Sequence, residues 1–146
     1  MISTRWFQGK NNINEALEIR KKVFIEEMNL IENINITDNF DDFAFNAVAY
    51  EDDVPVGTGR LFFKDGKYFI DNVCVIKEFR GRHYADLIVR MLVRRAVNMG
   101  AEKTYTECSQ RIKMLFENIG FETVQSNEQG IHLMVKSGDV SGHCCN

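Results

Sequence analysis

The sequence predicts a three-layer α/β domain of the α+β class, with a mixed central sheet of about seven strands and four helices. Three observations support this fold class. An apolar run at 73–76 is typical of a buried strand, and a basic glycine loop and a long amphipathic segment ending near Gly100 follow it. A second strand pattern at 102–108 comes after a short connection, which implies a parallel strand pair joined by a helix. Asp65-Gly66 stands between two apolar runs and predicts a two-residue hairpin turn.

The first part of the chain is expected to form one strand and two helices. Residues 2–8 predict the strand. A helix that Asn11 or Asn12 can cap is expected to run to about Glu27, and Glu15 stands at the capping-box distance from Asn12. Residues 28–42 give mixed signals: the apolar residues at 30–36 suggest a short second helix, which ends at 37–39.

The middle of the chain predicts three consecutive strands. Residues 43–50 form the first, and Pro55 opens the second, where a missing backbone N–H is tolerated. The third follows the Asp-Gly turn, and hairpin pairing would place Arg60 opposite Asp71. Such a cross-strand ion pair contributes roughly 0.2–1 kcal/mol.

The last part is expected to alternate helix and strand. Gly100 is a natural end for the central helix, and Ser109 is expected to cap a helix at 110–119 that Gly120 closes. Strands at 121–126 and 131–136 would form a final hairpin. We therefore expect a single domain at 1–136 and a polar, loosely held tail at 137–146.

Composition excludes several classes of protein. The chain has 146 residues and a net charge of −3, which argues against nucleic acid or an anionic membrane as a partner. The start has no signal-peptide pattern and no segment is long and apolar enough to span a membrane, so we expect a cytoplasmic protein. Neither a disulfide framework nor a zinc site is expected, because the cysteines lack paired spacing: Cys74, Cys108, Cys144 and Cys145.

The loop at 80–83 carries the chemistry of an anion site. The first turn of a helix offers free backbone N–H groups and the positive end of the helix dipole. Gly81 allows close approach to the main chain, and Arg80 and Arg82 add positive charge. The basic loop of this acidic chain thus suits a small anionic ligand.

The run R-G-R-H-Y-A from Arg80 to Ala85 resembles the pyrophosphate loop, [QR]-x-x-G-x-[GA], of the GNAT superfamily of acyl-CoA-dependent N-acyltransferases. His83 replaces the central glycine of that pattern, but histidine is among the residues that can adopt the left-handed conformation. Residues 112–121 resemble a second motif of the family, A-x-x-L-Y-E-x-x-G-F. The order of the elements also resembles the family over residues 2–136.

The resemblance implies that the chain binds acetyl-CoA as an acyl donor. In the family, the strand before the loop splays from its parallel neighbour, and backbone groups in the gap bind the pantetheine and polarise the thioester carbonyl. The loop from Gly81 to Asp86 would take the pyrophosphate. The implied cofactor-binding residues are Val73, Cys74, Val75, Arg80, Gly81, Arg82, His83, Tyr84, Ala85, Asp86, Ser109 and Phe116.

The implied reaction is direct transfer of the acetyl group to a primary amine, on a small molecule or a peptide. Asp71 and Glu27 are the candidate bases, and Ser109 is a candidate at the strand end. Phe116 stands where many members have a tyrosine that protonates the thiolate, so another group or solvent would do so. Acidic residues near the acceptor would favour a cationic amine. Further carboxylate candidates for the general base are Glu26, Asp41, Asp42 and Glu107. The sequence leaves the oligomeric state open, with a homodimer as one candidate.

Two other classes of function remain open. Phe116 and His83 are compatible with a non-catalytic acyl-CoA-binding sensor or partner-binding module. An ordinary small-anion-binding protein of similar fold is the third reading. A covalent mechanism through Cys74 or Cys108 is disfavoured, because the sequence places no histidine to activate either thiol.

Overall fold

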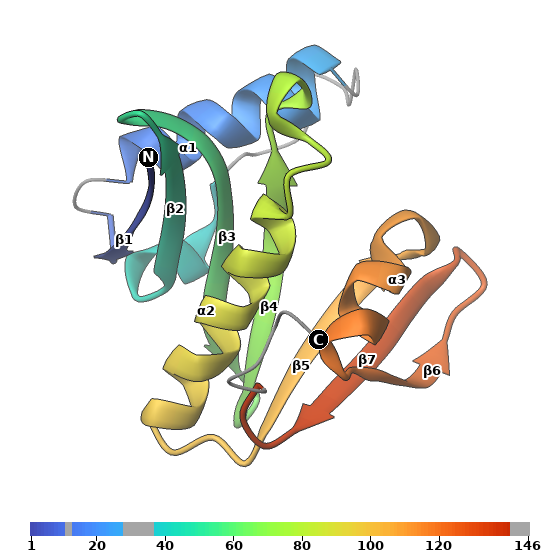
Figure 1. The fold of residues 1–146 in the computed structure, drawn as a ribbon. Coiled ribbons are helices and arrows are strands. Elements are labelled where there is room, and N and C mark those ends of the chain that lie inside the picture. The colour runs from blue at the N-terminus through green and yellow to red at the C-terminus, as the bar shows by residue number, and fades with distance from the viewer. Residues whose placement is uncertain (11–12, 28–36, 141–146) are drawn as a thin grey trace.

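The computed structural model describes residues 1–10, 13–27 and 37–140, and these form one mixed sheet flanked by helices (Figure 1). The strand order is β1-β2-β3-β4-β5-β7-β6, and only β4 and β5 run parallel to each other. This confirms the expected fold class and the expected parallel pair. The strands are β1 (Ile2–Gln8), β2 (Phe45–Glu51), β3 (Val54–Lys64), β4 (Lys67–Val75), β5 (Lys103–Ser109), β6 (Glu122–Ser126) and β7 (Ile131–Ser137).

The helices form two layers on opposite faces of the sheet. One cluster of buried apolar side chains packs α2 (Tyr84–Asn98) and α3 (Gln110–Ile119) against one face of the sheet. A second cluster packs α1 (Asn14–Arg20) against the other face (Figure 1). The described helices are α1 (Asn14–Arg20), the π-helical η1 (Lys21–Glu27) that continues it, η2 (Asn39–Asp42), η3 (Lys77–Phe79), α2 (Tyr84–Asn98) and α3 (Gln110–Ile119). None of the helices within the described ranges is both long and apolar enough to cross a bilayer. The second helix expected at 30–36 lies outside the described residues.

Two expectations near the N-terminal helix were wrong. Ile13, not Asn12, occupies the N-cap position of α1 and makes no side-chain cap hydrogen bond. Glu15 instead accepts a hydrogen bond of 2.5 Å from the Tyr50 hydroxyl, which ties α1 to β2. The strand expected from residue 43 begins at Phe45, because a single turn of 3₁₀ helix with an Asp38 capping box precedes it.

The central hairpin has the expected register, with a bulge that the sequence did not reveal. Asp65 (φ 52°) and Gly66 (φ 77°) form the turn, and Arg60 lies opposite Asp71. Between the Thr58–Cys74 and Arg60–Asp71 pairs β4 contains one extra residue, and Asn72 adopts a left-handed conformation (φ 51°). A bulge of this kind bends a strand and re-aims its side chains.

Close packing of α2 on β3 depends on a residue without a side chain. A Cβ atom added at Gly59 would lie 2.7 Å from Ile88 Cγ2 and 2.9 Å from Leu92 Cδ1. Both contacts are shorter than van der Waals separation, so glycine at this point lets the helix approach the sheet.

The tail is held more firmly than expected at one point. Val140 is buried and belongs to the apolar cluster between α2 and the sheet. Asp139 lies 3.7 Å from the guanidinium of Arg94 on α2. The polar composition of residues 137–146 concealed this single apolar anchor, and residues 141–146 lie outside the described part.

Candidate functional site

The parallel strands β4 and β5 separate after three paired positions. Their last bridge joins Ile70 and Thr106, although β4 continues to Val75 and β5 to Ser109. The two strands diverge toward their carboxyl ends (Figure 1). The opening that the resemblance implied is therefore present, and the last β4 residues have no ladder partner on β5.

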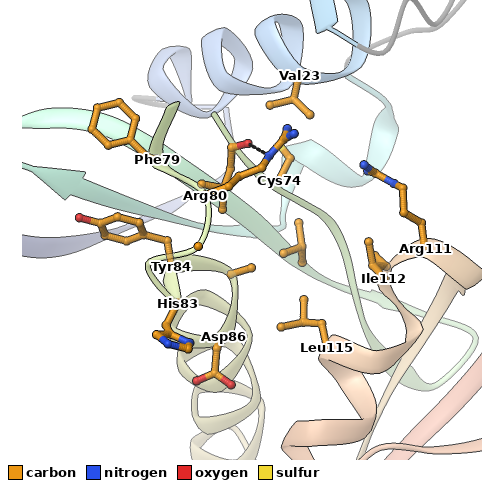
Figure 2. Close-up of a pocket in the computed structure, with 14 residues that line it drawn as sticks. Val23, Cys74, Phe79, Arg80, His83, Tyr84, Asp86, Arg111, Ile112 and Leu115 are labelled. Atoms are coloured by element: carbon orange, nitrogen blue, oxygen red, sulfur yellow. Dashed lines mark hydrogen bonds between the residues drawn. The ribbon is translucent and has the colours of Figure 1, made fainter. Parts of the chain in front are cut away.

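A cavity of about 320 Å³ lies at this opening, between the first turn of α2 and the side of α3 (Figure 2). Its walls are mostly apolar, while its rim carries charged side chains, as expected for a small-molecule site. The lining residues are Val23, Val73, Cys74, Val75, Phe79, Arg80, Gly81, His83, Tyr84, Ala85, Asp86, Arg111, Ile112 and Leu115.

The loop before α2 presents main-chain groups to this cavity. Gly81 (φ 79°) and His83 (φ 64°) both adopt left-handed conformations. His83 therefore has the left-handed backbone that was expected to be open to histidine at this position. His83 is the N-cap residue of α2 and makes no side-chain cap hydrogen bond. The first N–H groups of a 15-residue helix therefore lack a side-chain acceptor at the cap and favour an anion.

The two loop arginines point in different directions. Arg80 lines the cavity, and its Nε donates a hydrogen bond of 3.0 Å to the carbonyl oxygen of Val75 (Figure 2). Arg82 is not among the lining residues; its guanidinium pairs with Glu51 at the end of β2 at 2.7 Å. The side chain of Arg82 thus lies outside the cavity, and a phosphate contact through it stays a prediction.

Hydrogen bonds to Glu51 shift the pKa values of Glu51, Tyr84 and Arg82. The Tyr84 hydroxyl, 2.6 Å from Glu51 Oε1, and the Arg82 guanidinium lower the pKa of the Glu51 carboxyl. Burial of the Tyr84 phenol and the same hydrogen bond to Glu51 raise the pKa of Tyr84 to about 12. Tyr84 therefore stays protonated, and its hydroxyl is committed to Glu51.

Two expected cofactor contacts lie elsewhere. Phe116 is completely buried in the core, with its ring 5.0 Å from that of Phe121, and it does not line the cavity. Its neighbour Leu115 lines the wall instead. Ser109 occupies the N-cap position of α3 and its side chain makes no cap hydrogen bond, so the expected cap interaction is absent; it is also not among the lining residues. Glu27 ends η1, and its side chain lies outside the described part of the chain.

Asp71 is the first β4 residue beyond the last bridge to β5, at the vertex of the opening. Its two carboxylate oxygens accept hydrogen bonds of 2.8 and 2.7 Å from Arg60. The side chain of Asp71 is 29% exposed, whereas that of Arg60 is 3% exposed. The expected cross-strand pair is confirmed, and Asp71 stays partly exposed but is not among the residues that line the cavity.

Arg60 connects Asp71 to a larger buried cluster on the α1 face. Its guanidinium also contacts Asp38 and, at 3.3 Å, Asp41. Asp41 in turn accepts hydrogen bonds of 3.1 and 3.3 Å from Arg20, the last residue of α1. Three carboxylates face two guanidinium groups, which leaves a formal charge of −1 in the cluster.

The pKa shifts in this cluster have opposite directions. Desolvation raises the pKa of Asp71 above its ordinary value, and the hydrogen bonds from Arg60 offset part of that shift. Desolvation acts the same way on Asp41, but the hydrogen bond from Arg20, the backbone N–H of Asp38 and the charges of Arg20 and Arg60 outweigh it and lower its pKa. Of these two carboxylates, Asp71 is the one whose pKa is raised, which favours uptake of a proton.

The sequence interpretation missed the wall contributed by α3. Arg111, Ile112 and Leu115 share one side of a helix whose limits were predicted correctly, so their spacing was the available signal. In Figure 2, Arg111 extends from α3 toward the opening. Val23 of η1 also lines the cavity, and the sequence interpretation did not place it in the site.

Metal ligation finds no support in the described ranges. Within them, no group of three or more histidine, cysteine, aspartate or glutamate side chains is placed to hold a metal ion. Cys74 and Cys108 are both buried, and burial raises the pKa of the Cys108 thiol.

Comparison with known proteins agrees with this geometry. The pattern of the Acetyltransferase (GNAT) family matches residues 13–138. The uncharacterized N-acetyltransferase YjcF of Bacillus subtilis is 24% identical over 121 residues, which cover 83% of this chain and 86% of YjcF.

Two solved structures share the fold. An acyl-CoA N-acyltransferase from Pseudomonas aeruginosa superposes with a TM-score of 0.81 at 15% identity, covering 94% of this chain and 100% of that one. The PaiA N-acetyltransferase of Thermoplasma acidophilum, solved in complex with coenzyme A, has a TM-score of 0.72 at 9% identity, with 94% and 99% covered. With a family match that spans most of the chain, the protein belongs to the GNAT family of acetyltransferases.

Proposed function

We propose that this protein transfers an acetyl group from acetyl-CoA to a primary amine. One observation carries the proposal: where β4 loses its pairing with β5, a cavity opens between the end of β4 and α3, beside an α2 N-terminus whose cap supplies no side-chain acceptor. An elongated thioester attached to a diphosphate matches both features, with the anion at the helix and the thioester in the gap.

The residues around the cavity fit this donor. The main chain from Gly81 to Asp86 would bind the diphosphate, and Val73, Val75 and Leu115 supply apolar contact for the pantetheine arm. Arg80 fixes the carbonyl of Val75 and so orients the last β4 peptides beside the thioester. Coenzyme A in the related PaiA structure supports this assignment by analogy.

The donor supplies a thioester carbonyl carbon that an amine can attack directly. An ammonium acceptor first loses one proton to water, because only the neutral amine can attack. A carbon–nitrogen bond then forms, the carbon–sulfur bond breaks, and the nitrogen loses a second proton. Asp71 is the proposed acceptor of that proton, directly or through water, because its carboxylate is partly exposed at the vertex of the gap. Solvent protonates the departing thiolate, since Phe116 is buried and carries no proton to donate.

The acceptor is proposed to be a cationic amine on a small molecule or peptide. The cluster around Arg60 carries a formal charge of −1, and its two accessible members are carboxylates: Asp38 is 47% exposed and Asp71 is 29% exposed. An ammonium group is therefore attracted to the side of the sheet where deprotonation would occur.

The test has two parts. Isothermal titration should detect binding of acetyl-CoA, and a thiol assay over a panel of cationic and neutral amines should detect release of coenzyme A with a preference for cationic amines. Binding without turnover of any amine would favour the non-catalytic sensor, which the buried Phe116 also favours. Absence of binding would reject both functions.

Changing Asp71 to asparagine is expected to lower kcat about 100-fold, the usual loss when a general base is removed, without changing acetyl-CoA affinity. Activity of the wild type should fall as the pH drops through the raised pKa of Asp71, because the proton acceptor must be ionised. That acidic limb should be absent from the Asp71→Asn profile.

Asp38→Asn is the matched control, because it removes another carboxylate partner of Arg60 while leaving Asp71 in place. It should retain the acidic limb and most of the activity. Equal losses in both variants would mean that Asp71 acts only through Arg60.

A further inference from the structure

Glu51 lies outside the cavity, but it contacts the chain on both sides of His83 in the loop at 80–83, which we call the phosphate loop. Its Oε1 accepts a hydrogen bond of 2.6 Å from the Tyr84 hydroxyl, and its two oxygens lie 2.9 and 2.7 Å from Nη1 of Arg82. Arg82 and Tyr84 flank His83 in the chain. One carboxylate on β2 thus connects to the residues immediately before and after the N-cap of α2.

The backbone between these contacts needs external support. A non-glycine residue in the left-handed region is strained, and such a conformation persists only where its surroundings determine it. His83 (φ 64°) makes no side-chain cap hydrogen bond of its own. The guanidinium of Arg82 also lies 5.4 Å from the Phe79 ring, which further restricts this side of the loop.

We propose that Glu51 is a positioning residue that pre-orders the phosphate loop, and that Arg82 serves as the anchor for Glu51 instead of a phosphate ligand. This inference rests on the proposed binding of a coenzyme A thioester. Glu51 fixes the direction of the first N–H groups of α2. Because the loop is ordered before the ligand arrives, the free-energy cost of ordering it does not reduce the affinity. Arg82 neutralises the carboxylate that would otherwise repel the incoming diphosphate.

Substitutions distinguish Arg82 as an anchor for Glu51 from Arg82 as a phosphate ligand, because the two roles predict different changes in acetyl-CoA affinity. Glu51→Ala should weaken acetyl-CoA binding about fivefold, because it removes the contacts to both Arg82 and Tyr84. Arg82→Ala should weaken binding at least as much, since it also leaves the Glu51 carboxylate without its counter-charge, and the double variant should be no weaker than Arg82→Ala alone. The kcat of Glu51→Ala at saturating acetyl-CoA should not change. If Arg82 binds phosphate directly, Glu51→Ala would release it and tighten binding, or the two losses would add; either result overturns the proposal.

A second readout does not depend on coenzyme A. The Leu87 amide donates to the His83 carbonyl at 3.1 Å, so its hydrogen exchange reports the loop and the start of α2. In the ligand-free protein, exchange of the Leu87 amide should be about fivefold faster in Glu51→Ala than in the wild type. Unchanged exchange would overturn the positioning role, whereas faster exchange in a protein that binds no thioester would reject only the proposed function.

Lys10→Gln provides the control for loss of an exposed ion pair. Lys10 lies 3.0 Å from Asp42, and neither residue lines the cavity. This variant should change neither acetyl-CoA affinity nor Leu87 exchange. A comparable effect of Lys10→Gln would show that the Glu51 result is a general response to lost surface charge.

Discussion

Gly81→Glu is expected to reduce acetyl-CoA affinity by about 10³-fold. A carboxylate about 4 Å from one phosphate charge costs roughly 4 kcal/mol near a protein surface, which corresponds to this factor. The substitution should not prevent folding, because a Cβ atom at Gly81 would meet no atom within 4 Å. Isothermal titration and a thermal melt of the same sample would separate lost binding from lost stability.

Gly66→Glu is the matched control for this experiment. Gly66 has nearly the same backbone conformation (φ 77° against 79°) and equally open surroundings, but it lies in the β3–β4 turn. It reproduces the added charge and the backbone strain away from the cavity, so it should keep wild-type affinity. Micromolar affinity retained in Gly81→Glu would show that the phosphate lies elsewhere, and the proposed donor site would be wrong.

The loop and its helix could be predicted because their signals are local. A glycine, two arginines and an amphipathic run within 20 residues indicate a strand, an anion-binding turn and a helix, whatever surrounds them. Even the substitution of His83 for glycine was compatible with the backbone found. The splayed strands followed from the resemblance to the family, since residues 68–76 do not themselves reveal where pairing to β5 stops.

Side-chain directions required the tertiary structure. Arg80 and Arg82 look equivalent in sequence, but Arg80 bonds to Val75 and Arg82 to Glu51, a residue of another strand. In sequence, Glu51 opens an acidic run at 51–53, and nothing in that run indicates its partner. Phe116 matched a functional position of the family, whereas helix rotation directs Leu115 to the cavity and Phe116 into the core.

The ion cluster could not be predicted for a related reason. Hairpin register gave the pair between Arg60 and Asp71, but Arg20 and Asp41 come from elements whose contact depends on the whole fold. In sequence, Asp41 resembles its exposed neighbour Asp42. Only the structure shows that one is completely buried and the other paired with Lys10 at the surface.

Asp41→Ala is therefore expected to destabilise the protein by about 3–5 kcal/mol, the usual cost of removing one partner from a buried ion pair. Arg20 and Arg60, with side chains 1% and 3% exposed, would then face each other without the carboxylate between them. Denaturant unfolding should show this loss as a lower midpoint. Asp42→Ala, which removes only an exposed pair, should cost at most about 1 kcal/mol.

The same cluster predicts how the difference between wild type and Asp41→Ala depends on pH. The pKa of Asp41 is lowered in the folded state, so its contribution to stability is complete above the ordinary value of 3.8 and is lost as the pH falls through the folded-state pKa. The two proteins should differ fully at pH 7 and converge in strong acid. A difference that is small at pH 7, or constant down to the acid transition, would show that the Asp41 carboxylate does not hold the two arginines together.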